Sequence, residues 1–286
     1  MEKTKRKKRL SEYSFLRLSP GYLLLVIWVA FTIILIGWII GASFATTREI
    51  FTGTMFKSGL HFDNYVRALI DNRLMLYFAN TIIYTFTALI GILVISAPAS
   101  YVLSRFKFTG NKLIKNLFVS AMGIPQIMII LPLFYIASLV KITNTRWVLI
   151  LLYIGTGIPF TTFFLLSFFS TLPTTFEEAA AIDGCGPIKT FWVIMMPLAQ
   201  PGIITIMIFD FIIYWNEYFM ALVFATKSAL RPVAVGLFSM IQSMRYIGDW
   251  AGMFAAVVLV FMPTVILYVL LSEKIIQGVT PGAIKG

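Results

Sequence analysis

Long apolar stretches separated by short polar links dominate the pattern of this chain. Each stretch has about twenty residues or more with few charges, the length an α-helix needs to cross roughly 30 Å of hydrocarbon. Membrane-spanning β-strands are shorter and alternate in hydropathy, so the pattern predicts helices rather than a barrel. Six helices are predicted, over residues 21–44, 81–103, 117–140, 147–169, 202–225 and 253–271.

The composition indicates the same class. Hydrophobic residues make up 59% of the 286 positions, charged residues make up 12%, and the mean hydropathy is +0.89. A soluble domain carries about 25% charged residues, so this chain has too little polar surface to cover itself in water. We predict an all-α integral membrane protein in which residues 81–271 form the core. Pro125 and Pro132 are expected to kink or break the third helix, because each lacks a backbone donor.

The charge distribution predicts the orientation. Seven of the 23 basic residues precede residue 18, and such clusters stay on the cytoplasmic side next to anionic lipid. We therefore interpret residues 1–20 as a cytoplasmic, lipid-facing segment and not as a nucleic-acid-binding tail. Residues 45–80 then form an extracytoplasmic link, and six crossings return residues 272–286 to the cytoplasm. A cleaved signal peptide is the rival interpretation of the first stretch, but its apolar region would have only about 7–15 residues.

Residues that could carry catalysis or hold a cofactor are scarce. The chain has one cysteine, Cys185, and one histidine, His61. A single cysteine excludes an internal disulfide, and the pair offers little to a metal. No G-x-x-x-x-G-K-[ST] sequence occurs, so the chain lacks the loop that binds nucleotide phosphates. We expect a chain that is not an enzyme and has no cofactor or metal of its own.

Acidic residues inside the fifth predicted helix are the exception. Asp210 and Glu217 are seven positions apart, so on a continuous helix they would share a face, two turns from each other. Charged groups within a membrane usually face the bundle interior or a water-filled cavity. One interpretation is that this face, with Asn216 nearby, lines a pathway for a polar solute. The other is that Glu217 lies at the outer interface and Asp210 makes a structural hydrogen bond.

Residues 174–198 differ from every other link. Capping-box patterns predict the start of a helix, and acids suit its positive end. Three alanines follow, then glycines and a proline mark a turn into a second helix that a further proline ends. The markers are Thr174 with Glu177 or Thr175 with Glu178, then Gly184, Gly186, Pro187 and Pro197. An acidic, alanine-lined helix–turn–helix predicts a docking surface for a partner protein. The alternative, an amphipathic connector on the membrane surface, is disfavoured because anionic lipid would repel its acidic turn.

The same stretch resembles the EAA loop of ABC importer permeases, E-A-A-x₃-G-x₉-I-x-L-P. The matching residues are Glu178, Ala179, Ala180, Gly184, Ile194 and Pro197, with Met196 in place of leucine. Further resemblances to the carbohydrate-uptake group lie at Asn64-Tyr65, Asn80-Thr81, Trp215-Asn216-Glu217 and residues 278–286. Together these residues are similar to the smaller, six-helix permease of the maltose-type transporters.

This resemblance implies the transmembrane fold of type I ABC importers in a bacterial cell membrane, working by alternating access. The implied partners are a second homologous permease, two copies of a cytoplasmic ABC ATPase that holds ATP and Mg²⁺, and an extracytoplasmic solute-binding protein. The implied ATPase-coupling residues are Glu177, Glu178, Ala179, Ala180, Asp183, Gly184 and Pro197, with Thr280 and Lys285 in the tail. The pathway candidates are Asp210, Trp215, Asn216 and Glu217.

Two other functions share part of this pattern. An ABC permease for an amino acid, a polyamine or phosphate would have the same loop, because the EAA pattern alone does not select the solute. A secondary transporter or channel would work without an ATPase and would leave the loop without a role.

Overall fold

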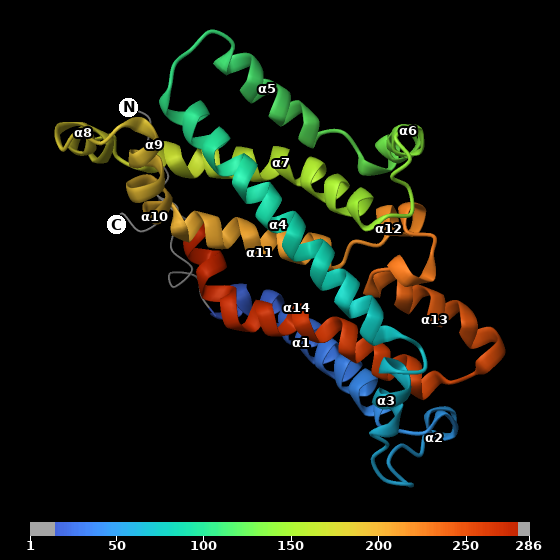
Figure 1. The fold of residues 1–286 in the computed structure, drawn as a ribbon. Helices are drawn as coiled ribbons and strands as arrows, with labels where there is room; N and C mark the ends of the chain where they lie inside the picture. The colour runs from blue at the N-terminus through green and yellow to red at the C-terminus, as the bar shows by residue number, and fades with distance from the viewer. Residues whose placement is uncertain (1–14, 280–286) are drawn as a thin grey trace.

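The computed structural model describes residues 15–279, which form helices joined by loops (Figure 1). The long helices are α1 (Phe15–Ser43), α4 (Leu74–Arg105), α7 (Arg146–Thr171) and α14 (Trp250–Val279). Two bent pairs of helices are further candidate spans. The first joins α5 (Asn111–Met122) to α6 (Gln126–Leu139) at 102°, and the second joins Pro187–Leu198 to α11 (Gln200–Trp215) at 73°. The described residues thus contain up to six candidate membrane spans, if each bent pair counts as one.

Shorter elements connect these spans. They are α2 (Thr47–Thr52), α3 (Asp63–Leu69), α8 (Thr175–Ile182), α9 (Pro187–Thr190), a π-helical turn (Phe191–Met195), α10 (Met196–Leu198), α12 (Phe219–Phe224), a 3₁₀ turn (Ser228–Leu230) and α13 (Val233–Ile247). The predicted tail contacts Thr280 and Lys285 lie outside the described residues.

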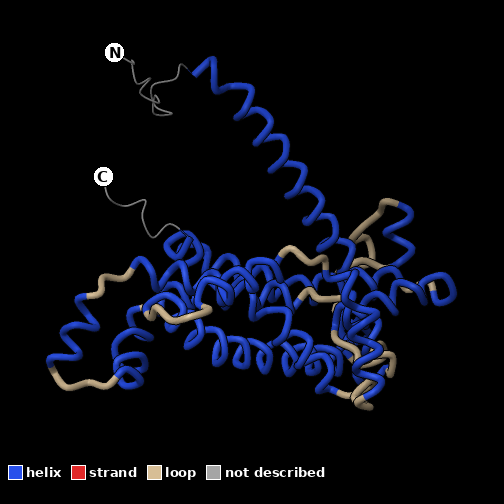
Figure 2. Tube along the Cα trace, turned by 90° about the horizontal axis from the view of Figure 1, so that it is seen from above, coloured by secondary structure: helices blue, strands red, loops and turns tan. Residues whose placement is uncertain are grey.

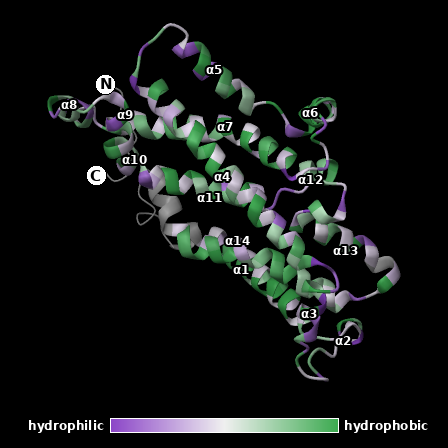
Figure 3. Cartoon of the chain, in the orientation of Figure 1, coloured by the Kyte–Doolittle hydropathy of each residue, from purple (hydrophilic) through white to green (hydrophobic). Residues whose placement is uncertain are grey.

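The centre of the bundle is the pair α4 and α7, with α11 packed against both (Figure 1). Hydroxyl side chains line part of this contact, and Ser100 Oγ donates to the carbonyl of Thr162 at 3.0 Å. Small polar residues let membrane helices approach closely and bond across the interface. Tyr84, Leu149 and Tyr153 are fully buried beside them. Hydrophobic residues cover the helices, whereas hydrophilic ones collect at loops and helix ends (Figure 3).

Helix α1 is anchored at its C-terminal end. Figure 2 shows it running away from the other spans toward the N-terminus. Near the anchored end, Trp38 packs edge to face on Phe254 of α14, with ring centroids 5.2 Å apart. Asn64 of α3 donates to the carbonyls of Ser43 and Ala45 at 2.8 and 2.9 Å. The apolar window within Ser19–Ser43 has no buried residue, so this part of α1 must face lipid or another membrane protein.

The link predicted over residues 45–80 is more ordered than expected. It contains α2 and α3, and α4 begins at Leu74 rather than at residue 81. Thr46 and Glu49 form a capping box at the start of α2, and the Glu49 carboxylate also accepts hydrogen bonds from Ser58 N and Oγ at 2.6 and 2.8 Å. Hydrogen bonds to the carboxylate lower the pKa of Glu49 to about 2, and the bond from the Thr46 backbone N–H has the largest effect.

Two predicted spans are not single helices. The third breaks at residues 123–125, because Pro125 disfavours helical backbone at the residue before it, whereas Pro132 lies inside α6 without ending it. The fifth, predicted over 202–225, ends at Trp215 and resumes as α12. The predicted outer link 226–252 contains α13, and α14 continues into the predicted tail.

Gly236, on α13, is expected to tolerate no side chain. An added Cβ would lie closer than 3.0 Å to three ring carbons of Tyr77 on α4, and the Tyr77 Oη–Ser228 Oγ hydrogen bond of 3.0 Å holds that ring. Overpacking costs about 1–3 kcal/mol, so Gly236→Ala should lower the melting temperature of the detergent-purified protein. Gly37→Ala, with nothing within 4 Å of the added Cβ, is the control. Equal melting temperatures for the two variants would contradict the close packing of α13 on α4.

Candidate functional site

Residues 174–198 project beyond the end of the bundle, where α8 is the outermost helix (Figure 1). After α8 the chain turns at Gly184, whose φ of +75° is a left-handed conformation that glycine adopts without steric cost. Cys185 N donates to the carbonyl of Ala180 at 2.8 Å and closes the turn. Pro187 lies in the first turn of α9. The segment therefore has the helix–turn–helix that its sequence predicts.

The predicted capping box does not form. Thr174 precedes α8 with φ −72° and ψ −15° and makes no side-chain bond to a backbone N–H. A capping residue needs a non-helical backbone to aim its oxygen at those N–H groups, and Thr174 is already helical. Its Oγ1 donates instead to Glu178 Oε1 at 3.2 Å. Thr175 lies inside the helix and cannot cap it. Pro197 does not end the second helix either, because it lies in the first turn of α10.

The two glutamates of α8 have different surroundings. Glu177 forms an ion pair with Arg105 at the end of α4, with Oε1 2.6 Å from Nε, and Arg105 Nη2 also donates to the carbonyl of Leu172 at 2.8 Å. The Arg105 and Glu177 side chains are only 12% and 19% exposed, whereas Glu178 is exposed. Glu177 thus holds α8 against the bundle, and Glu178 is the acid that a partner can reach.

An apolar and acidic surface covers the outside of this segment. Ile182 on α8 and Ile188 on α9 are 87% and 78% exposed. We call the exposed residues Glu178, Ala179, Ile182, Asp183 and Ile188 the docking surface. Exposed apolar groups rimmed by polar ones mark interaction sites. This surface is therefore better suited to contact with a partner protein than to exposure to solvent.

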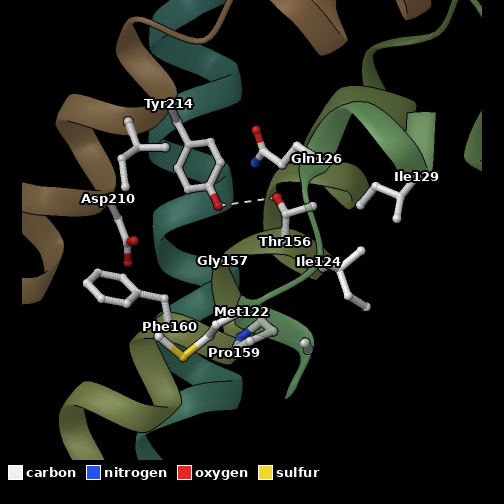
Figure 4. A pocket seen from close by; sticks show the side chains of 13 residues that line it. Met122, Ile124, Gln126, Ile129, Thr156, Gly157, Pro159, Phe160, Asp210 and Tyr214 are labelled. Atoms are coloured by element: carbon white, nitrogen blue, oxygen red, sulfur yellow. Dashed lines mark hydrogen bonds between the residues drawn. The ribbon is translucent and has the colours of Figure 1, made fainter. Parts of the chain in front are cut away.

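A pocket of about 400 Å³ lies between α7, α11 and the break from α5 to α6 (Figure 4). Its volume is within the roughly 300–1,000 Å³ of ligand pockets. The polar residues that line it are Gln126, Thr156, Asp210 and Tyr214, and Phe160 adds an aromatic ring. We call it the mid-span pocket, because it lies about halfway along α7 and at the break within the third span.

Asp210 brings a carboxylate to this pocket. The residue is 1% exposed, and its Oδ2 accepts a hydrogen bond from Thr161 Oγ1 at 2.7 Å. Tyr214 Oη and Thr156 Oγ1 are hydrogen-bonded at 3.4 Å (Figure 4). The two interpretations of Asp210 are therefore compatible, because one oxygen makes a structural bond while the residue lines a pocket.

Trp215 and Asn216 lie outside the mid-span pocket. Trp215 Nε1 donates to the carbonyl of Val260 on α14 at 3.3 Å. Asn216 Nδ2 donates to the carbonyl of Ile212, one turn earlier, at 2.8 Å. These contacts fix the end of α11. Of the four pathway candidates, Asp210 is the one that lines the pocket.

Glu217 caps α12. Its Oε1 accepts from Met220 N at 2.6 Å, and its Oε2 accepts from Ala221 N at 3.0 Å and from Tyr153 Oη at 2.8 Å. Because α11 ends two residues before Glu217, this residue is not on a continuous helix with Asp210. The prediction that the two acids share one helix face is wrong.

Glu217→Gln is expected to destabilise the start of α12. An amide has one acceptor oxygen, whereas two N–H groups and a hydroxyl now share two oxygens. A buried donor left without a partner costs about 1–3 kcal/mol, so the melting temperature in detergent should fall. Asn216→Ala, which loses one bond within its own helical turn, should shift it less. A Glu217→Gln variant as stable as wild type would contradict the capping role.

Comparison with known proteins places the chain in a family. Residues 91–280 match the family described as the inner membrane component of binding-protein-dependent transport systems. The diacetylchitobiose uptake system permease NgcG of Streptomyces coelicolor is 33% identical, over 93% of this chain and 88% of its own length. The trehalose/maltose transport system permease MalG of Thermococcus litoralis is 34% identical, over 87% of this chain and 90% of its own length.

A solved structure has the same fold. It is a bacterial ABC transporter involved in the import of the acidic polysaccharide alginate, and the two chains superpose with a TM-score of 0.79 at 23% identity, covering 91% of this chain and 98% of the other. The family match spans more than half of the chain and agrees with the resemblance of residues 178–197 to ABC importer permeases. The chain belongs to the inner membrane components of binding-protein-dependent transport systems.

Proposed function

We propose that this chain is a permease subunit of an ATP-driven importer for a sugar or oligosaccharide. The observation that carries this proposal is similarity along almost the whole chain to permeases named for diacetylchitobiose, trehalose/maltose and starch degradation products. The mid-span pocket supports it, because its hydroxyl, amide and carboxylate groups suit a ligand rich in hydroxyls. A permease for an amino acid, polyamine or phosphate has no comparable support.

The complete transporter would contain three kinds of partner protein. A second, homologous permease would pair with this chain in the membrane, and two copies of a cytoplasmic ABC ATPase would bind ATP and Mg²⁺. An extracytoplasmic binding protein would deliver the sugar. In this arrangement residues 174–198 and both termini lie on the cytoplasmic side, and the docking surface contacts an ATPase. The apolar, acidic character of that surface supports a protein partner there.

Reconstitution tests the proposal. The complete complex, purified from cells that co-express the four proteins, would be placed in liposomes with ATP inside and the binding protein outside. We expect uptake of labelled maltose or diacetylchitobiose that requires ATP, and no uptake of labelled glutamate or putrescine. Uptake that needs an ion gradient and no ATPase would support a secondary transporter instead, and uptake of a non-sugar solute alone would support the other permease class.

A further inference from the structure

The break between α5 and α6 falls within the third candidate span, and it exposes irregular backbone. Pro125 has no N–H, and the N–H groups of Gly123 and Ile124 reach back only to Ser120 and Ala121, at 3.1 and 3.3 Å. No residue of α5 is buried. Non-helical backbone within a bilayer is tolerated where protein covers it or where it lines a water-filled cavity. Residues at the break, Met122, Ile124 and Gln126, line the mid-span pocket. We therefore interpret the break as the wall of a polar cavity.

The groups that surround this cavity can bind a sugar ring. Figure 4 shows Asp210 and Tyr214 on one wall, Thr156 on a second and Gln126 on the third. Only Oδ2 of the Asp210 carboxylate has a hydrogen-bond partner among the described residues. A sugar hydroxyl both donates and accepts, so it can bond a carboxylate oxygen and an amide. The ring of Phe160 offers an apolar face for the C–H groups of the sugar.

The charge of the pocket restricts which sugars it can hold. Among its thirteen lining residues there is one carboxylate and no lysine, arginine or histidine. A uronate or sulfonate would be placed beside Asp210 with no cation to pair with it, and burying an unpaired charge is costly. An uncharged sugar meets no such penalty. The solved relative imports an acidic polysaccharide, so the shared fold does not itself decide the charge of the solute.

We infer that the mid-span pocket is a sugar-contact site within this chain that accepts uncharged sugar units and discriminates against acidic ones. The inference rests on the proposed function. It adds the site at which this subunit contacts the solute and the class of sugar that the transporter accepts. Asp210 and Gln126 supply the polar contacts, and the absence of a cation supplies the discrimination.

Equilibrium binding without the binding protein tests this directly, because the binding protein imposes its own selectivity. The complete transporter in nanodiscs would be titrated with maltose and diacetylchitobiose as uncharged probes and with a glucuronic-acid disaccharide as the acidic probe. We expect the acidic disaccharide to bind at least tenfold more weakly than the better uncharged one. Asp210→Asn keeps an acceptor for Thr161 and should weaken the binding of uncharged sugars about fivefold to tenfold. It should also reduce the difference in affinity between the uncharged and the acidic probes.

Matched variants keep the result interpretable. Gln126→Ala removes an exposed side chain, so it carries the test if Asp210→Asn folds poorly, and it should also weaken binding severalfold. Thr32→Val, whose hydroxyl bonds only a carbonyl of its own helix on α1, should bind as wild type. The inference would be overturned if the pocket variants bound both probes with the affinities of the Thr32→Val control. It would also be overturned if the wild type bound both probes equally. Either result would leave the proposed function standing. A wild-type complex without ATP-dependent sugar uptake would overturn both.

Discussion

Glu178→Lys is expected to abolish ATP-driven uptake while leaving the helix bundle folded. Glu178 is exposed on α8, and its one described side-chain bond is from the hydroxyl of Thr174. Lysine is a good helix former, so α8 should persist. In the proposed transporter, an ATPase surface that pairs with this acid would be basic. A lysine would then repel it, and like charges in a buried interface cost several kcal/mol. We expect uptake by the reconstituted complex to fall at least tenfold, together with loss of the ATPase from the purified complex.

Two variants separate charge from local structure at this position. Glu178→Gln removes the charge and keeps the size, so its uptake should be intermediate. Thr174→Val removes the bond to Glu178 without changing any charge and should retain uptake. If Glu178→Lys still carried its ATPase and took up sugar at the wild-type rate, the docking surface would not be the site where the ATPase binds.

Breaking the Arg105–Glu177 pair should also impair transport, for a different reason. Removing one member of a buried ion pair costs about 3–5 kcal/mol, and the cost here should be smaller because both side chains keep some exposure. Arg105→Glu or Glu177→Arg alone should let α8 move relative to α4, so ATP hydrolysis continues while uptake falls severalfold. Faster amide hydrogen exchange over residues 172–182 would report the loosened helix.

Charge exchange provides the control for this pair. The double variant Arg105→Glu with Glu177→Arg restores opposite charges and should recover part of the uptake and of the exchange protection. Recovery distinguishes a specific pair from damage to the fold. Equal loss in the single and double variants, or single variants that lose the ATPase altogether, would contradict a positioning role for Arg105.

The sequence located the long apolar helices well and their ends poorly. The length of an apolar stretch is enough to reveal a span, because a helix exposed to water does not carry twenty apolar residues in a row. The helix ends depend on polar capping residues, which the pattern of apolar residues does not include. The pair Thr46 and Glu49 has the spacing of a capping box, a signal that could have revealed α2 within the supposed link. Pro125 marked a break in the third span, but the bend of 102° depends on packing that no local pattern records.

The candidate site was recovered in part for similar reasons. Asp210 was identified because a carboxylate in an apolar span is rare whatever surrounds it. Glu217 was placed on the same helix face as Asp210 because the prediction assumed one continuous helix, whereas α11 ends at Trp215. Arg105 was not among the predicted site residues, since its partner Glu177 is 72 positions away and the sequence offers no sign of the pairing. Single residues with unusual chemistry are visible in a sequence, whereas pairs distant along the chain are not.

The bend of 73° between Pro187–Leu198 and α11 has a mechanical consequence. Ala199 lies at the corner, and Asp210 lies eleven residues farther along the chain, about 16.5 Å away at 1.5 Å per residue. If the corner acts as a fulcrum, a rotation of about 10° would displace the Asp210 backbone by roughly 2.9 Å. That distance is comparable to the length of a hydrogen bond. A small tilt imposed at residues 174–198 would therefore be enough to form or break contacts in the mid-span pocket.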